Sequence, residues 1–185
     1  MNRRRALMGA DGAAPLTECF VKTGDPVITD GIVRTTASAW ITMDREFSPG
    51  TDPWEIVIAF NRYRKTGAYQ TIVTSNGFQL KTPWDSNNVK IYLAHSTQWD
   101  IQDGVNSFSA AVNTKVWFKI TYNAGTYIYY RSTNGTTYSE INRKTGASTI
   151  KASTIQFGSN NSLTDFDLNE TYIKINGSVF WKPYM

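Results

Sequence analysis

Residues 116–141 of this 185-residue chain read VWFKITYNAGTYIYYRSTNGTTYSEI, and this stretch gives the clearest indication of the fold. Every second residue from Val116 to Tyr122 is apolar or aromatic. An alternation with a period of two is typical of a half-buried β-strand. Asn123-Ala124-Gly125 and Asn134-Gly135 supply the residues that tight hairpin turns need, because they tolerate positive φ angles. The stretch therefore predicts three consecutive antiparallel strands joined by two tight turns.

The same alternation recurs along the rest of the chain, and turn residues stand where it restarts. Residues 54–63 are apolar on both sides, which predicts a central strand covered on both faces. Short strands at regular spacing with such turns predict an all-β antiparallel sandwich of two sheets. The other expected strands are residues 27–35, 37–47, 69–75, 78–82, 90–96, 153–158, 170–175 and 178–182.

Composition and charge narrow the possible functions. Three of the 19 basic residues are Arg3, Arg4 and Arg5, which leaves 16 basic against 15 acidic residues in the body. A nearly neutral body argues against a nucleic-acid-binding domain, where a clustered basic face is expected. The internal basic cluster, residues 62–65, is interpreted as a solvated strand end. No apolar run is long enough to span a membrane, so no membrane partner is expected.

The N-terminal residues differ in character from the rest of the chain. We expect residues 1–25 to form an ordered arm and residues 26–185 to form one domain. The apolar stretch at residues 6–10 is shorter than the hydrophobic region of a signal peptide and ends at Asp11. An ordered arm needs a partner, and the exposed sheet edge of a neighbouring subunit is one such partner. Cys19 is the only cysteine, which excludes an intramolecular disulfide.

Several segments resemble one superfamily. Residues 116–123 with Tyr127-Ile128-Tyr129 are similar to the Trp-x-x-φ-x-Thr-Tyr-Asp/Asn-Gly segment of laminin-G-like, concanavalin A-like jelly rolls. Residues 1–8, 166–168 and 172–177, with Trp181, resemble segments of a phage- and prophage-borne branch of that superfamily. The resemblance covers about residues 27–181. The resemblance implies a concanavalin A-like jelly roll that serves as a tail, fibre or capsid-surface module. It also implies a glycan ligand, because many relatives bind glycans on the concave sheet.

Glycosidase chemistry is one function to weigh, because some jelly rolls of this superfamily are glucanases. Their active strand carries Glu-x-Asp-x-x-Glu, and this string is absent from the sequence. The nearest approach is Asp44-Arg45-Glu46, whose two carboxylates share one strand face roughly 6.5 Å apart. A retaining pair flanks the scissile bond at about 5–5.5 Å instead. We therefore interpret this segment as a solvated strand end paired with Arg45, and expect no enzyme activity.

The sequence offers few residues that could bind a metal ion or act as a catalytic nucleophile. Asp165, Asp167 and Asn169 place oxygen side chains on one face, which makes them candidate calcium ligands. The favoured alternative is a structural use, in which the Asp167 carboxylate accepts backbone N–H groups at a strand entry. No cofactor is expected, calcium being the only one that these residues suggest. His95 is the only histidine and stands beside Ser96, without the partners that a zinc site or a catalytic triad needs.

Aromatic side chains offer the remaining candidate site. Tyr127 and Tyr129 alternate with Ile128 and Tyr130, so one of the two pairs must leave the core. Sugars present apolar C–H faces rimmed by hydroxyls, and their sites combine an exposed ring with amides and charged groups. The alternative is that these rings only stabilise cross-strand pairs. The candidate carbohydrate-binding residues are Tyr92, Trp99, Tyr127, Tyr129, Arg131, Asn87 and Asn88.

Two functions follow as expectations. The first is a non-catalytic module of a phage virion or tail that binds a glycan and attaches the particle to a host or surface. The alternative is a structural capsid or tail decoration protein that assembles through its N-terminal arm. The expected partners are a glycan or other virion proteins, in a homo-oligomer, and the expected location is the virion.

Overall fold

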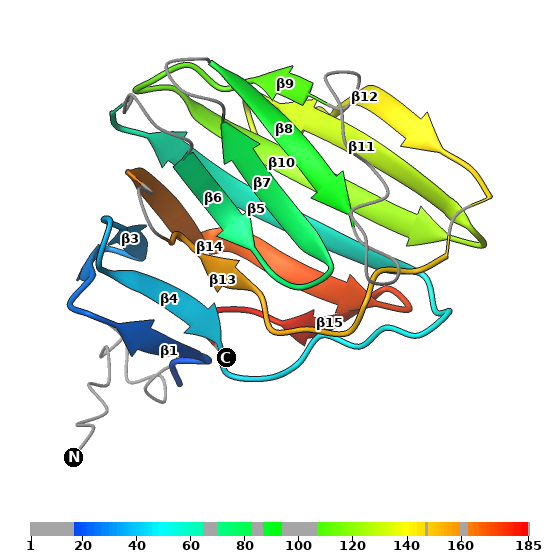
Figure 1. The fold of residues 1–185 in the computed structure, drawn as a ribbon, viewed down its shortest axis with the longest axis horizontal. Helices are drawn as coiled ribbons and strands as arrows, with labels where there is room; N and C mark the ends of the chain where they lie inside the picture. The colour runs from blue at the N-terminus through cyan, green and yellow to red at the C-terminus, as the bar shows by residue number, and fades with distance from the viewer. Residues whose placement is uncertain are drawn as a thin grey trace.

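The computed structural model describes residues 17–64, 70–82, 87–93, 107–146, 148–159 and 163–184. All regular structure in these ranges is β-strand, and two antiparallel sheets lie face to face (Figure 1). In spatial order, the seven-stranded sheet contains β1 (Phe20–Thr23), β4 (Trp40–Met43), β13 (Gln156–Phe157), β6 (Gln70–Thr74), β7 (Phe78–Thr82), β8 (Asn88–Leu93) and β9 (Ser107–Ser109). The eight-stranded sheet contains β12 (Ser139–Lys144), β11 (Thr126–Ser132), β10 (Lys115–Asn123), β5 (Trp54–Arg62), β14 (Thr164–Ile175), β3 (Ile32–Arg34) and β2 (Val27–Thr29), and β15 (Ser178–Trp181) pairs with β14. The predicted all-β sandwich is confirmed.

The core lies between the inner faces of the two sheets. β5 is the centre of the eight-stranded sheet, between β10 and β14. Its inward residues are buried, and so are Val57 and Ala59 on the outer face. Val57 lies between Lys119 and Tyr172 in the strand register, so long side chains of the neighbouring strands flank it. The predicted central strand with two covered faces is therefore confirmed.

The two turns expected in residues 116–141 have different outcomes. Between β10 and β11, Ala124 and Gly125 have φ angles of 44° and 79°, and Asn123 pairs with Thr126. This is the expected tight turn. The second expected turn is wrong, because residues 133–138 form a longer loop before β12. The Asn134 Oδ1 atom accepts hydrogen bonds from the backbone N–H groups of Thr136 and Thr137, which holds this wider loop together.

Several of the expected boundaries change. Residues 27–35 form the hairpin β2–β3, because Asp30 and Gly31 take φ angles of 52° and 76° and reverse the chain. The strand expected at residues 170–175 is the second part of the longer β14, which has a register shift between Asp167 and Tyr172. β1 lies within the expected arm but pairs with β4, so the sandwich begins before residue 26. Residues 1–16 of the expected arm lie outside the described residues.

Arg62 corrects the interpretation of residues 62–65 as a solvated strand end. This last residue of β5 is fully buried between the sheets. Its guanidinium donates to Gln70 Oε1 at 2.7 and 3.1 Å and to the Ala110 carbonyl at 3.2 Å. Burial lowers its pKa below the ordinary value. A buried cation is tolerated only when its N–H donors have hydrogen-bond acceptors, and Gln70 and the Ala110 carbonyl are those acceptors.

Candidate functional site

The expected exposure of Tyr127 and Tyr129 is wrong. Both residues are 0% exposed and lie in the core. The ring of Tyr127 lies 4.9 Å from that of Tyr122 and 5.7 Å from that of Trp54, measured between centroids. The physical reason is the register that the tight turn imposes. It pairs Tyr127 with Tyr122 and Tyr129 with Ile120, and directly paired residues lie on the same face of a sheet.

The other carbohydrate candidates are only partly brought together. The Arg131 Nε atom donates to the Ser109 carbonyl of β9 at 2.9 Å, and Ser109 pairs with Asn88 of β8. Asn87 and Asn88 are exposed near this edge of the seven-stranded sheet. Tyr92 belongs to β8, but its side chain lies outside the described part of the structure, as do Trp99, His95 and Ser96.

The candidate calcium ligands contact cations and backbone groups of the chain itself. Asp165 accepts two hydrogen bonds from Arg34, at 2.8 and 2.9 Å, and Asp167 pairs with Lys115. Asp167 also accepts the backbone N–H of Asn169 at 3.0 Å, at the register shift of β14 rather than at a strand entry. The Asn169 amide donates to the Asp30 carbonyl. Calcium takes six to eight oxygen ligands, and these engaged side chains do not fit such an ion.

Asp44 and Glu46, the nearest approach to a glycosidase pair, are exposed just after β4. Arg45 donates to the Asp44 carboxylate at 3.0 and 3.2 Å. The predicted solvated strand end paired with Arg45 is confirmed.

Four half-buried aromatic side chains that were not among the candidate site residues occupy the outer face of the eight-stranded sheet. They are Trp117 on β10, Tyr130 on β11, Tyr138 just before β12 and Tyr172 on β14. We call these four residues the outer aromatic face. The Lys119 ammonium links two of them, because it lies 4.6 Å from the ring centroid of Tyr130 and 4.3 Å from that of Tyr138. Lysines that cover ring faces in this way make cation–π contacts.

Glu55 of β5 is the charged centre of this face. Its carboxylate accepts the Tyr172 hydroxyl at 3.0 Å and lies 4.0 Å from the Lys119 ammonium and 3.9 Å from that of Lys174. The pKa of the Tyr172 phenol is raised, first by burial and then by the Glu55 charge. The pKa of Tyr138 is raised by burial and by Glu55 and Glu170. One carboxylate therefore faces two ammonium groups and accepts a hydrogen bond from one hydroxyl.

Trp117 is fixed firmly at one side of the outer aromatic face. Its indole N–H donates to Glu170 at 2.6 Å, and the Lys115 ammonium lies 4.7 Å from its ring centroid. A Cβ added to Gly135 would come within 2.8 Å of the indole, so the loop of residues 133–138 lies directly against the ring. These contacts fix the orientation of the Trp117 ring.

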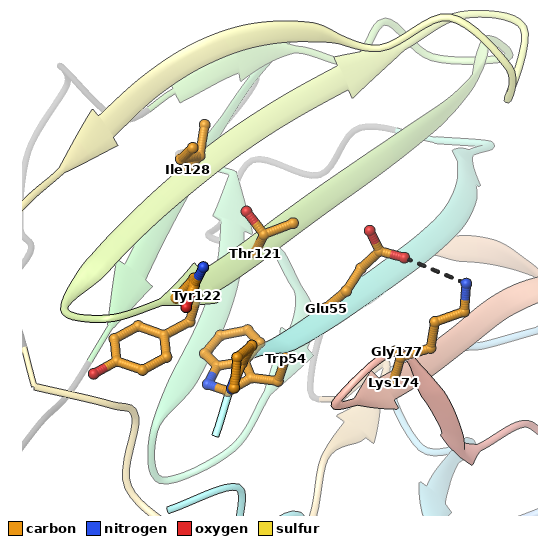
Figure 2. A pocket seen from close by; sticks show the side chains of 9 residues that line it. Trp54, Glu55, Thr121, Tyr122, Ile128, Lys174 and Gly177 are labelled. Atoms are coloured by element: carbon orange, nitrogen blue, oxygen red, sulfur yellow. Dashed lines mark ion pairs between the residues drawn. The ribbon is translucent and has the colours of Figure 1, made fainter. Parts of the chain in front are cut away.

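A pocket of about 470 Å³ opens beside Glu55, at the β10–β11 turn end of the sheet. Figure 2 shows the Glu55 side chain pointing toward Lys174, with Thr121 and Ile128 on the neighbouring strands and the Trp54 and Tyr122 rings at the strand ends. The Glu55 carboxylate accepts hydrogen bonds, the Lys174 ammonium donates them, and Ile128 supplies an apolar wall. Pocket and outer aromatic face are continuous, because Glu55 contacts Tyr172 and lines the pocket. The remaining lining residues are Pro53, Asn123 and Gly177.

No protein-family model matches this sequence, and no curated protein matches it either. Solved structures do match, at low identity. A functionally unknown protein from Saccharomyces cerevisiae aligns with a TM-score of 0.55 and 9% identity, over 85% of this chain and 96% of that one. The exoplasmic/lumenal domain of VIP36, in a form bound to Ca²⁺ and Man3GlcNAc, aligns with a TM-score of 0.52 and 10% identity, over 80% and 82%.

The binding domain of botulinum neurotoxin DC, in complex with rat synaptotagmin II, aligns with a TM-score of 0.58 and 15% identity. The alignment covers 86% of this chain but 42% of the toxin domain, so this chain spans less than half of that domain. Identities this low carry information on the fold alone. Together with the two antiparallel sheets, they show that the chain has a lectin-like jelly-roll fold.

Proposed function

We propose that this chain is a non-catalytic carbohydrate-binding module that holds a glycan at the pocket beside Glu55 and on the adjoining outer aromatic face. The observation that carries the proposal is the setting of Glu55, which faces the Lys119 and Lys174 ammonium groups and the Tyr172 hydroxyl next to half-exposed rings. Carboxylates and ammonium groups bind the hydroxyls of a sugar, and aromatic rings bind its C–H face.

The lysines that cover the rings do not prevent binding. A cation–π contact at an exposed site is worth about 0.5–1 kcal/mol. Isolated surface ion pairs contribute little more. The Lys174 ammonium lies 4.9 Å from the ring centroid of Tyr172. Lys119 and Lys174 can therefore turn from ring to sugar hydroxyl at small energetic cost. The solved structure of VIP36 supports the proposal, because that protein is bound to Man3GlcNAc and shares most of its length with this fold.

Variants of Glu55 test the site. Glu55→Gln keeps the shape of the side chain but removes the charge that faces both ammonium groups, so we expect glycan affinity to fall about tenfold, or about 1.4 kcal/mol. Tyr172→Ala removes a ring and its hydrogen bond and should have a similar effect. A glycan array identifies the ligand and isothermal titration calorimetry measures the loss. Val21→Ser, an exposed change on the other sheet, is the matched control and should bind normally.

A blank array across bacterial and mucin glycans would overturn the proposal, and so would unchanged affinity in both variants. The non-catalytic part has its own readout. Incubation with each bound glycan should release no reducing sugar, and any release that depends on this protein would contradict it.

We further propose that the module belongs to a phage virion or tail, where it attaches the particle to a host or surface glycan. The support is the resemblance of residues 1–8, 166–168 and 172–177 to that branch of the superfamily. No helix in the described part of the chain has the length and apolar character needed to cross a bilayer.

A structural role in assembly is the second candidate, and the sheet edges favour it. β1 and β2 are edge strands, and they carry Val21 and Val27, which are 54% and 63% exposed. Exposed edges of this kind invite pairing with another chain. Light scattering distinguishes the two functions. Assembly through the arm requires an oligomer that dissociates when residues 2–16 are deleted, a deletion that leaves β1 and the buried Cys19 in place, whereas a glycan binder keeps its affinity as a monomer.

A further inference from the structure

A second pocket, of about 390 Å³, lies toward the other end of β11, where the chain enters the loop of residues 133–138. It is more polar than the pocket beside Glu55, and the nine residues that line that pocket do not contribute to it. Its lining residues include Arg131, Ser132, Asn134, Thr137, Ser139 and Glu140.

Arg131 supplies the positive charge of this pocket. Its Nε atom donates to the Ser109 carbonyl of the opposite sheet at 2.9 Å, and this bond restrains the guanidinium beside β9, the edge strand of that sheet. Among the described residues, Arg131 has no carboxylate partner. The remaining N–H donors of its planar fork are therefore available to a ligand.

Asn134 adds a donor whose orientation is fixed. Its Oδ1 atom accepts three hydrogen bonds, from the Ser132 hydroxyl at 3.0 Å and from the backbone N–H groups of Thr136 and Thr137. These bonds determine which end of the amide faces the loop, and the Nδ2 group has no partner among the described residues. The donor is exposed and preorganised, which reduces the entropy lost on binding.

The one carboxylate of the pocket is already neutralised. Glu140 accepts hydrogen bonds from Arg143 at 2.7 and 2.8 Å, and this pair lowers the pKa of the Glu140 carboxyl. Arg131 therefore gives the pocket a net positive charge, in contrast to the surroundings of Glu55, where cations and carboxylates alternate.

We propose that this pocket binds a sugar that carries a carboxylate, such as a hexuronic acid. The planar carboxylate pairs with the fork of Arg131, which matches it in geometry and charge. The hydroxyls of the sugar bind Asn134 Nδ2 and the Thr137 and Ser139 hydroxyls. This site is distinct from the one proposed beside Glu55, and the two can be tested independently.

Glucuronate is the probe, with glucose, acetate and sulfate as comparisons, in NMR titrations of the full chain. We expect binding of glucuronate, at least tenfold weaker binding of acetate because it lacks hydroxyls, and no binding of glucose at this pocket. Arg131→Gln should abolish the chemical-shift changes that glucuronate causes. Arg131→Lys should bind glucuronate more weakly than the wild type does, because an ammonium lacks the planar, paired N–H donors of a guanidinium. Asn134→Asp keeps the acceptor that holds the loop but replaces the donor with a charge that repels a carboxylate, so it should also lose binding.

Several outcomes would overturn the proposal. They are the absence of glucuronate binding, unchanged binding in Arg131→Gln, and sulfate binding as strong as glucuronate, which would indicate a site for any anion. Thermal melting confirms that each variant is folded before it is titrated. Glu55→Gln should leave glucuronate binding unchanged, so failure of the site beside Glu55 and failure of this one give different results.

Discussion

The rings of Tyr127 and Tyr129 stack against each other in the core, but their hydroxyls have different surroundings. The Tyr127 hydroxyl donates to the Ser148 carbonyl at 2.8 Å, whereas the Tyr129 hydroxyl is buried without a partner among the described residues. An unsatisfied buried hydroxyl costs about 1–3 kcal/mol, and a satisfied one contributes about 1 kcal/mol. We expect Tyr127→Phe to lower the free energy of unfolding by about 1 kcal/mol and Tyr129→Phe to raise it by about 1 kcal/mol. Urea denaturation measures both, and a loss of stability in Tyr129→Phe would contradict this account.

The same two residues show how far single residues could be predicted from the sequence. The alternation of residues 127–130 required one pair to leave the core but did not say which pair. The two-residue turn at Ala124-Gly125 determines the answer, because it pairs Tyr122 with Tyr127. If the residue pairs are counted outward from this turn, Tyr130 falls on the outer face and becomes a site candidate. The sequence therefore contained enough information to place Tyr130. The contact of Glu55 with Tyr172, in contrast, depends on pairing between strands that are 117 residues apart.

At the scale of elements, the loop of residues 133–138 and the outer face of β10 stabilise each other. Gly135 has a φ angle of 74°, and a Cβ there would overlap the indole of Trp117. Gly146 has a φ angle of 69° but open space around its Cα, so it is a matched control. We expect Gly146→Ala to cost about 1 kcal/mol through backbone strain alone and Gly135→Ala to cost about 1–2 kcal/mol more. Equal losses in thermal unfolding would show that the loop does not pack on Trp117.

Strands and turns could be predicted where the local sequence pattern determines them. They could not be predicted where contacts with residues far away in the sequence determine them. The hairpin β10–β11 and the central strand β5 follow from alternation and turn residues, and both are confirmed. The loop after β11 was expected to be tight because Asn-Gly favours such turns, yet the bonds of the Asn134 side chain support a wider loop. Arg62 was expected in solvent, but its partners Gln70 and Ala110 belong to other parts of the fold, which no local pattern reveals.

At the scale of the whole molecule, the sandwich holds many of its tyrosines in the protonated form. Burial is the first cause of the raised pKa in each case, so the folded protein binds these protons more tightly than the unfolded chain does. The residues are Tyr63, Tyr127, Tyr129, Tyr138, Tyr172 and Tyr184. Lys115 also has a raised pKa, and although burial alone would lower it, its bonds to Asp167 and Glu170 outweigh that effect.

A raised pKa in the folded state has a definite consequence for stability at high pH. Below the ordinary tyrosine pKa of 10.0, both states are protonated and the stabilisation is complete. As pH rises above that value, the unfolded chain loses protons that the folded protein keeps, so the free energy of unfolding falls. Each fully buried tyrosine, such as Tyr127 or Tyr129, contributes a slope of about 1.4 kcal/mol per pH unit. We therefore expect cooperative unfolding above pH 10, with these phenols titrating only as the chain unfolds. Phenolate absorbance and circular dichroism recorded together test this, and titration of all tyrosines near pH 10 in a protein that stays folded would contradict it.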